Sequence, residues 1–180
     1  MAGETIYSFP PGLRAVGSGY LLGVPVPVYL MAAFLAAGGV FTRHTTWGYQ
    51  IYAIGANPEA ARLSGVPVRA RQMLVYTISG AMAGLAAIVY LARLNSAEAD
   101  IGEPLMLPAV AAVLVGGTSL FGGLGSLSGT LVGAVLLTVV LNGMNLLNVN
   151  GNWQPLVNGV IVILAAWIDI FTRRRIDASA

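Results

Sequence analysis

The chain has 180 residues, of which 57% are hydrophobic and only 9% charged, with a formal net charge of +2. Because soluble globular domains carry about 25% charged residues, this composition excludes a soluble domain and indicates a polytopic membrane protein. The sequence has no cysteine and a single histidine, His44, which excludes disulfides, thiol chemistry and Cys-based metal sites. All nine basic residues are arginines. They lie beside apolar segments, where they orient topology, so they give no reason to expect a nucleic-acid partner.

The apolar runs predict an all-α fold, a polytopic membrane helix bundle of about five transmembrane helices within residues 24–180. Residues 1–23 are expected to form an extracytoplasmic N-terminal segment, in which Pro10, Pro11 and several glycines break any helix. This segment lacks the basic start and apolar core of a signal peptide. The predicted spans are residues 25–41, 73–92, 104–121, 127–147 and 155–168, the last of which can extend to 172. With that extension, each approaches the roughly 20 residues that cross a bilayer.

The arginine distribution orients these spans. Loop 42–71 and the C-terminus are rich in arginine, whereas loop 93–103 carries Arg93 together with three acids and residues 148–154 carry no charge. By the positive-inside rule, loop 42–71 and the C-terminus are cytoplasmic and the N-terminus lies outside. The residues that carry this prediction are Arg43, Arg62, Arg69, Arg71, Arg173, Arg174, Arg175, Glu98, Asp100 and Glu103.

A short polar helix is predicted within the cytoplasmic loop. Asn57 can cap it, Pro58 suits its first position, and Glu59 lies in the first turn, where the helix dipole favours an acid. Gly65 is placed to end the helix in the left-handed conformation, and Pro67 discourages continuation. A helix of about two turns is unstable alone in water. It therefore needs a surface on which to dock.

Glycines recur at a four-residue spacing in two places. Gly80 and Gly84 form one pair, and Gly125, Gly129 and Gly133 form a ladder. This spacing allows helix backbones to approach closely in lipid. We expect tight helix packing there, with a glycine-lined substrate path as the less favoured alternative.

The glycine-rich segment 116–126 has the composition of a phosphate-binding loop, but the chemistry excludes that function. A Walker A loop needs a lysine, and a dinucleotide fingerprint needs a soluble strand and helix on its two sides. Here there is no lysine and both flanks are membrane spans. The segment is interpreted as a tight reversal between two spans, in which glycines supply unusual backbone angles. We expect no catalytic residue and no ATP hydrolysis in this chain.

Three amides lie within predicted spans. Asn142 and Asn145 share one helix face, and Asn158 lies early in the last span. Buried amides in a membrane are candidates for a substrate path, and they suit sugar hydroxyls because they both donate and accept. The favoured alternative is an interhelical hydrogen bond.

The acidic residues have simpler explanations. Asp169 and Arg173 are four residues apart, and a local ion pair explains them. Glu98, Asp100 and Glu103 could be read as a metal cluster, but they are better explained as a solvated face or a docking edge, so no metal site is expected.

Two long motifs give the chain a family resemblance. Residues 53–68 closely resemble the cytoplasmic coupling loop of ABC-transporter permeases of the ribose/xylose/arabinose class. Residues 109–123, continuing to Thr130, look like that class's second signature, and residues 142–147 with the terminal arginines match its C-terminal style. Glu59, Ala60 and Ala61, followed by Gly65, also fit the Glu-Ala-Ala-x-x-x-Gly pattern of importer permeases more broadly. The Ile-x-Leu-Pro that follows in that broader pattern is absent here, which points to the simple-sugar branch. Such permeases have about twice as many spans, so the chain looks like the C-terminal half.

The resemblance implies a function without catalysis in this subunit. Two permease copies, identical or different, would form a monosaccharide path in the lipid of a bacterial inner membrane, and a periplasmic sugar-binding protein would deliver the sugar. A separate cytoplasmic ABC ATPase would hold ATP and Mg, so this chain itself would need no cofactor. That ATPase would bind the helix 57–65 and drive rocking of the spans. The residues assigned to ATPase coupling are Asn57, Glu59, Ala60, Ala61, Arg62 and Gly65.

Two other functions remain open. An ion-coupled secondary transporter would need a buried acid or histidine, and no predicted span carries a charge in its middle. A truncated, inactive permease remnant is the second alternative. An upstream reading frame that codes for further spans would favour a transporter over the remnant.

Overall fold

The computed structural model describes residues 6–7, 11–97 and 102–177. The chain divides into two compact units, each described by itself below. Unit 1 comprises Met1–Ile51 and Ala61–Glu103, and unit 2 comprises Tyr52–Ala60 and Pro104–Ala180. Helices α3 and α4 cross between the two.

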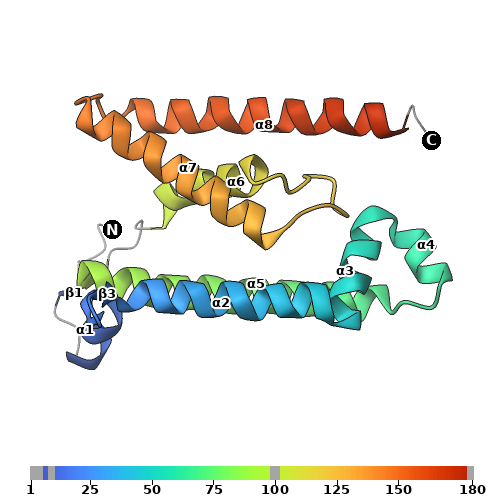
Figure 1. Ribbon diagram of the computed structural model, residues 1–180, viewed down its shortest axis with the longest axis horizontal. Coiled ribbons are helices and arrows are strands. Elements are labelled where there is room, and N and C mark those ends of the chain that lie inside the picture. Colours follow the sequence, from blue (N-terminus) through green and yellow to red (C-terminus); the bar gives the residue numbers. More distant parts are fainter. Residues whose placement is uncertain (1–5, 8–10, 98–101, 178–180) are drawn as a thin grey trace. The chain divides into compact units, whose positions relative to one another are not determined.

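The first part of the chain, which ends with β4, is drawn in blue to green in Figure 1. Its elements are β1 (Ile6–Tyr7), α1 (Pro11–Ser18), β2 (Tyr20–Leu21), β3 (Val24–Pro25), α2 (Val26–His44), α3 (Thr46–Ala56), α4 (Pro58–Leu63), α5 (Val68–Leu94) and β4 (Ser96–Ala97). The remaining elements are α6 (Glu103–Val115), α7 (Leu127–Leu146) and α8 (Trp153–Asp177).

The N-terminal segment in unit 1 corrects one expectation. Residues 1–23 were expected to contain no helix, but α1 begins at Pro11, because proline is tolerated in the first turn, where no backbone N–H is needed. The Cα position of Gly17 lies so close to Ala92 of α5 that a Cβ there would meet the Ala92 backbone, and Ala92 is only 2% exposed. Helix α1 is thereby packed against the C-terminal end of α5.

Two short strand pairs complete unit 1. Strand β1 pairs antiparallel with β4, with Ile6 opposite Ala97. Strands β2 and β3 form a hairpin whose turn contains Gly23 at φ +82°. Strand β1 thus pairs with β4, and α1 packs against the end of α5, so described residues of the N-terminal segment contact the start of loop 93–103; both were predicted to lie outside.

Unit 2 is built around small residues. A hydrophobic core joins α6, α7 and α8, with Ala111 fully buried at 0% exposure. Alanines at the centre let the three backbones approach closely, which is how helices pack where lipid removes the hydrophobic driving force. The core residues are Ala111, Ala112 and Leu137, with Ala134, Ile161 and Val162 packed against them.

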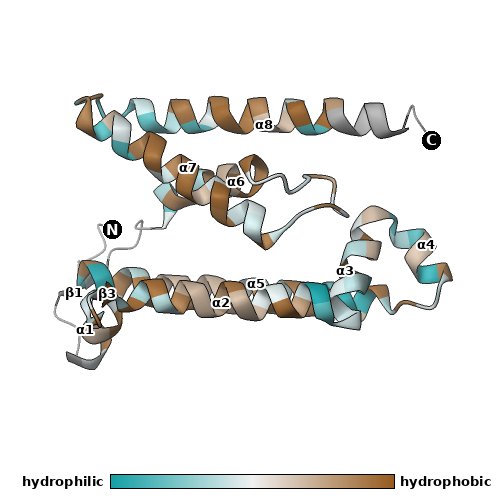
Figure 2. Ribbon diagram, in the orientation of Figure 1, coloured by the Kyte–Doolittle hydropathy of each residue, from teal (hydrophilic) through white to brown (hydrophobic). Residues whose placement is uncertain are grey.

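Four of the five predicted spans are confirmed as long apolar helices. Among the described residues, four helices are long and apolar enough to cross a membrane: Val26–His44, Val68–Leu94, Leu127–Leu146 and Trp153–Phe171. In Figure 2 the ribbons of α2, α5, α7 and α8 carry many residues coloured as hydrophobic, whereas α4 has hydrophilic residues among hydrophobic ones. The most apolar 18-residue stretches of α2 and α5 contain no buried residue, as expected for surfaces that face lipid or other helices.

The span predicted at 104–121 is wrong in length. Helix α6 ends at Val115 after 13 residues, which gives about 20 Å of helix against a hydrocarbon core of about 30 Å. Gly117 ends it in the left-handed conformation, at φ +81°. The Gly117 N–H donates to Leu114 O and the Thr118 N–H to Val113 O, which is the Schellman pattern of helix termination.

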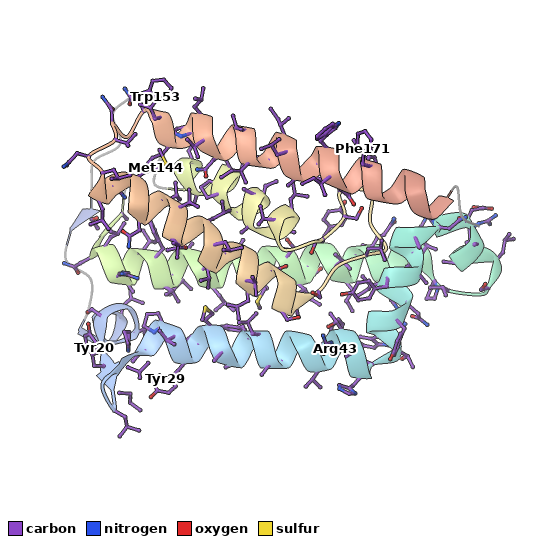
Figure 3. The ribbon with its side chains drawn as sticks, turned by 45° about the horizontal axis from the view of Figure 1, so that its top comes forward. Tyr20, Tyr29, Arg43, Met144, Trp153 and Phe171 are labelled. Atoms are coloured by element: carbon purple, nitrogen blue, oxygen red, sulfur yellow. The ribbon has the colours of Figure 1, made fainter. Side chains whose placement is uncertain are left out.

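Aromatic residues mark both ends of α8. Figure 3 shows Trp153 beside Met144 where α7 meets α8, and Phe171 toward the other end of α8. Trp167 and Phe171 pack edge to face with ring centroids 5.0 Å apart. Aromatic residues near both ends of a span are typical of the two membrane–water interfaces.

Candidate functional site

The capping predicted for the short polar helix is confirmed. Helix α4 comprises Pro58–Leu63, with Pro58 first and Glu59 in the first turn. The backbone N–H groups of Glu59 and Ala60 donate to Asn57 Oδ1 at 3.1 and 3.0 Å. Asn57 therefore satisfies two of the N–H groups that the start of a helix leaves without an intrahelical partner.

The end of α4 is equally well defined. Gly65 lies at φ +81°, its N–H donates to Arg62 O, and the Val66 N–H donates to Ala61 O, both at 3.0 Å. These two bonds form a Schellman motif, which needs a left-handed residue at the position of Gly65. Both ends of a helix of only six residues are thus fixed by local hydrogen bonds.

Helix α4 presents most of its surface to the surroundings. Ala61 is its buried residue, at 6% exposure, whereas Pro58, Glu59, Ala60 and Arg62 are exposed. Leu63 is 77% exposed and adds an apolar group to the helix surface. The sequence analysis missed Leu63, although an apolar residue between polar ones at the helix end was a visible signal.

A second helix precedes α4 within the loop predicted at 42–71. Helix α3 was not expected, and with the ends of α2 and α5 it leaves only a few non-helical residues in this loop. In unit 1, Arg71 Nε donates to Gln50 Oε1 at 2.6 Å, and the Arg71 guanidinium lies 4.9 Å from the Trp47 ring centroid. Hydrogen bonding and a cation–π contact therefore join the start of α3 to the start of α5.

In unit 2, the C-terminal half of α3 packs against the segment 116–126. Gly122 and Gly123 have φ of +86° and +79°, so the chain reverses there as predicted. A Cβ on Gly122 would lie 2.8 Å from Gly55 O, and one on Gly123 would lie 2.8 Å from Ala56 Cα. Tyr52 also donates its hydroxyl to Gly125 O at 3.1 Å. These contacts place segment 116–126 directly against the residues that precede the Asn57 cap.

Asp169 binds the same segment from α8. Asp169 Oδ2 accepts a hydrogen bond from Ser119 Oγ at 2.8 Å and another from the Leu120 N–H at 3.2 Å. The predicted local explanation, an ion pair with Arg173, gave Asp169 no such long-range role, and the Arg173 side chain lies outside the described residues. Ser119 is 8% exposed and Asp169 is half-buried, so the bond between them is partly shielded from the surroundings.

The three amides differ in their surroundings. Asn145 Oδ1 accepts a hydrogen bond from Gln154 Nε2 at 2.8 Å, which links the end of α7 to the start of α8. Asn142 is exposed on α7. Asn158 is 4% exposed, and within the described part of the chain its Oδ1 atom has no hydrogen-bond partner. Asn158 is therefore the amide with unused acceptor capacity.

The two sets of glycines also differ. A Cβ on Gly129 would meet Gly116 O, one on Gly133 would meet Ala112 O, and one on Gly125 would lie 2.8 Å from the Thr118 side chain. A Cβ on Gly80 or Gly84 would meet no described atom within 4 Å. The ladder thus packs inside unit 2, while the pair on α5 presents an open face.

Acidic residues do not gather into a metal site in the part of the chain that the structure describes, where no group of three His, Cys, Asp or Glu side chains occurs. Glu98 and Asp100, considered above as metal ligands or a solvated edge, lie outside that part.

Known proteins resemble most of this chain. Residues 2–166 match the family described as branched-chain amino acid transport system / permease component. The ribose import permease protein of Escherichia coli K12 is 44% identical over 153 residues, which cover 85% of this chain and 48% of that protein. The xylose transport system permease protein of the same strain is 42% identical over 85% of this chain and 39% of its own length. The ribose import permease protein of Bacillus subtilis is 39% identical over 88% of this chain and 49% of its own length.

The chain spans about half the length of the ribose permeases that it matches. No solved structure matches it. The family match and the four long apolar helices identify a multi-pass protein of the inner membrane. Since the match extends over nearly the whole chain, this protein belongs to the permease-component family of the branched-chain amino acid transport system type.

Proposed function

We propose that this chain is part of the membrane permease of an ATP-binding-cassette importer for a monosaccharide. The chain would form part of the translocation path and would couple to a separate ATPase subunit through residues 57–65. The observation that carries this proposal is α4, a six-residue helix capped at both ends and exposed on most of its surface. A helix this short is not stable by itself, so its precise termination favours a docking role.

The names of the relatives support a sugar as the substrate. Two are ribose import permeases and one belongs to a xylose transport system. Both sugars are pentoses, and we propose a monosaccharide of this size for the present chain. Asn158 is the strongest candidate for a path residue, because its buried Oδ1 can accept a hydrogen bond from a sugar hydroxyl. Asn145, which bonds Gln154, and the exposed Asn142 are weaker candidates.

The partners follow from the proposed function. A cytoplasmic ATPase would bind ATP and Mg and would receive α4, with Glu59, Ala60, Arg62 and the exposed Leu63 available on the helix surface. A periplasmic binding protein would deliver the sugar, and a second permease copy would complete the path. We place loop 42–71 and the C-terminus in the cytoplasm and residues 1–23 outside. In this arrangement the chain itself catalyses no reaction.

Substitution of Gly65 tests the coupling role at a single position. We expect Gly65→Val to strain the left-handed cap and misplace α4, because a β-branched residue disfavours positive φ. Gly65→Asn is the matched control, since asparagine tolerates the left-handed conformation. A Cβ at this position meets no described atom within 4 Å, so a Cβ clash does not separate the two variants and their tolerance of positive φ does.

The measurement is ATP hydrolysis and uptake of D-ribose and of D-xylose by the transporter assembled in proteoliposomes with its ATPase, its binding protein and permease spans that correspond to the unmatched half of the ribose permeases. We expect sugar-stimulated hydrolysis in the wild type and in Gly65→Asn, and its loss in Gly65→Val at equal accumulation of the membrane subunit. Wild-type stimulation in Gly65→Val would contradict the assignment of α4 as the ATPase contact. Failure of both sugars to stimulate the wild type would contradict the proposed substrate class.

A further inference from the structure

Segment 116–126 contacts two distant parts of unit 2 at once. On one side it meets α3 at Gly55 and Ala56, the residues directly before the Asn57 cap. On the other side Ser119 and Leu120 donate hydrogen bonds to Asp169 of α8. The segment therefore connects the residues directly before α4 to Asp169 of the membrane-spanning helix α8, far along the chain.

The contact with α3 leaves little room for relative movement. A Cβ on Gly122 would lie 2.8 Å from Gly55 O, and one on Gly123 would lie 2.9 Å from Ala56 Cβ. These contacts involve backbone atoms and the short Ala56 side chain rather than long, flexible side chains. A displacement of one segment therefore displaces the other. The Tyr52 hydroxyl bond to Gly125 O adds a second point of attachment.

The contact with α8 consists of two hydrogen bonds to a carboxylate oxygen. A carboxylate that accepts hydrogen bonds is a charge-assisted acceptor, and such bonds are about twice as strong as neutral ones. The segment is also braced internally, because the Ser119 N–H donates to Leu124 O at 3.0 Å and the Phe121 N–H donates to Ser119 Oγ at 3.3 Å. Ser119 thus belongs both to the reversal and to its attachment to α8.

From these contacts we propose that segment 116–126 transmits movement between α4 and α8, and that Asp169 is the positioning residue that holds the segment to α8. A shift of α4 on its partner moves residues 55–57, these displace Gly122 and Gly123, and the Ser119–Asp169 bond passes the displacement to α8. This inference rests on the proposed function, because it assigns to α4 the movement that an ATPase imposes.

Three substitutions test the connection in the assembled transporter. Asp169→Ala removes the acceptor for both hydrogen bonds, Ser119→Ala removes one donor, and Asp169→Asn keeps an acceptor oxygen without the charge. Thr138→Val is the matched control, because the Thr138 hydroxyl donates to Ala134 O within one turn of α7 and lies outside this chain of contacts. Each variant is assayed for ATP hydrolysis with and without D-ribose or D-xylose, and for uptake of the same sugar.

We expect uncoupling rather than general inactivation. Unstimulated ATP hydrolysis should stay within about twofold of the wild type, while the sugar-stimulated rate should fall about 5- to 20-fold in Asp169→Ala, within the range by which coupling residues act. Ser119→Ala should lose less, and Asp169→Asn should retain part of the stimulation. The double variant Ser119→Ala/Asp169→Ala should lose less than the product of the two single losses, because the bond that the two side chains share is already absent in each single variant.

Normal stimulation in both Asp169→Ala and Ser119→Ala would overturn the inference, and so would losses that multiply in the double variant. Where Asp169→Ala does not accumulate in the membrane, Ser119→Ala and Asp169→Asn decide the question by the same criteria. Gly123→Ala gives a second approach through α3 and should also uncouple, whereas Gly151→Ala, which has open space around it, should not. A wild type without sugar-stimulated hydrolysis would instead contradict the proposed function.

Discussion

Gly133 shows how a single hydrogen atom in place of a side chain sets the spacing of two helices. A Cβ at this position of α7 would meet Ala112 O and lie 2.7 Å from Gly116 N. Ala112 belongs to the core of unit 2, so the backbones of α6 and α7 approach each other where the glycine ladder was predicted to pack. That the ladder serves helix packing in the assembled protein stays a prediction, which substitution can test.

Gly133→Ala is therefore expected to destabilise the protein by about 1–3 kcal/mol, the usual cost of forcing extra atoms into a packed contact. Gly143→Ala is the matched control in the same helix, because a Cβ there meets no described atom within 4 Å. It should be neutral or slightly stabilising, since alanine is the better helix former. Thermal unfolding of the purified protein in detergent measures both variants, and equal unfolding temperatures would contradict close packing at Gly133.

At the residue scale, the features that could be predicted are those that depend on near neighbours. The Asn57 cap and the left-handed Gly65 were predicted correctly because both act within three or four residues of themselves. The role of Asp169 was missed because its partner Ser119 lies 50 residues away. No local pattern pairs a carboxylate with one particular serine, so Asp169 was assigned the nearest basic residue instead.

At the scale of elements, too, prediction succeeded where the signal lies within the element's own sequence. Helices α2, α5, α7 and α8 are long apolar runs, and hydropathy locates them because burial in lipid acts on the whole run. Helix α6 was predicted too long because hydropathy does not register a backbone break. Residues 116–121 are uncharged and could belong to a membrane span, but the left-handed Gly117 ends the helix. Helix α3 was missed because its composition of tyrosine, tryptophan and glycine carries no strong helix signal.

The topology stays a prediction, and the contacts within each unit can be compared with it. In unit 1 the N-terminal strand β1 pairs with β4, which follows α5. In unit 2 the residues before α4 meet segment 116–126, which in turn meets α8 beyond its midpoint. The first group was predicted outside and the second inside, so each set of contacts joins segments that were expected to share a side.

Cysteine labelling tests this topology directly, because the chain contains no cysteine of its own. A cysteine that replaces the exposed Ser64, just after α4, should react with a membrane-impermeant maleimide only from the cytoplasmic side. A cysteine that replaces Ser96 in β4 should react only from the outside. The expectation follows from the arginines that flank α4 and the acids of loop 93–103. Reaction of both positions from one side would contradict the topology.

At the scale of the whole molecule, helix faces that contact no described residue indicate where further helices can pack. Gly80 and Gly84 lie on α5, where a Cβ at either position would meet no described atom within 4 Å. The most apolar 18-residue stretch of α5 has no buried residue. Glycines at this spacing serve close helix contacts in lipid, and lipid chains bathe such a face without reproducing those contacts. The chain also spans only about half the length of the ribose permeases that it resembles.

We therefore expect that these 180 residues, with an ATPase and a sugar-binding protein but no further permease spans, do not transport sugar. Adding the spans that correspond to the unmatched half of the ribose permeases, in one chain or as a separate polypeptide, should restore assembly and uptake. The assay is ATP-dependent uptake of D-ribose and D-xylose into vesicles with and without those spans. In the restored transporter, Gly80→Leu should disrupt assembly, because a large side chain would occupy the face on which the added spans pack. ATP-dependent uptake by the 180 residues alone would show that the open α5 face needs no further helix.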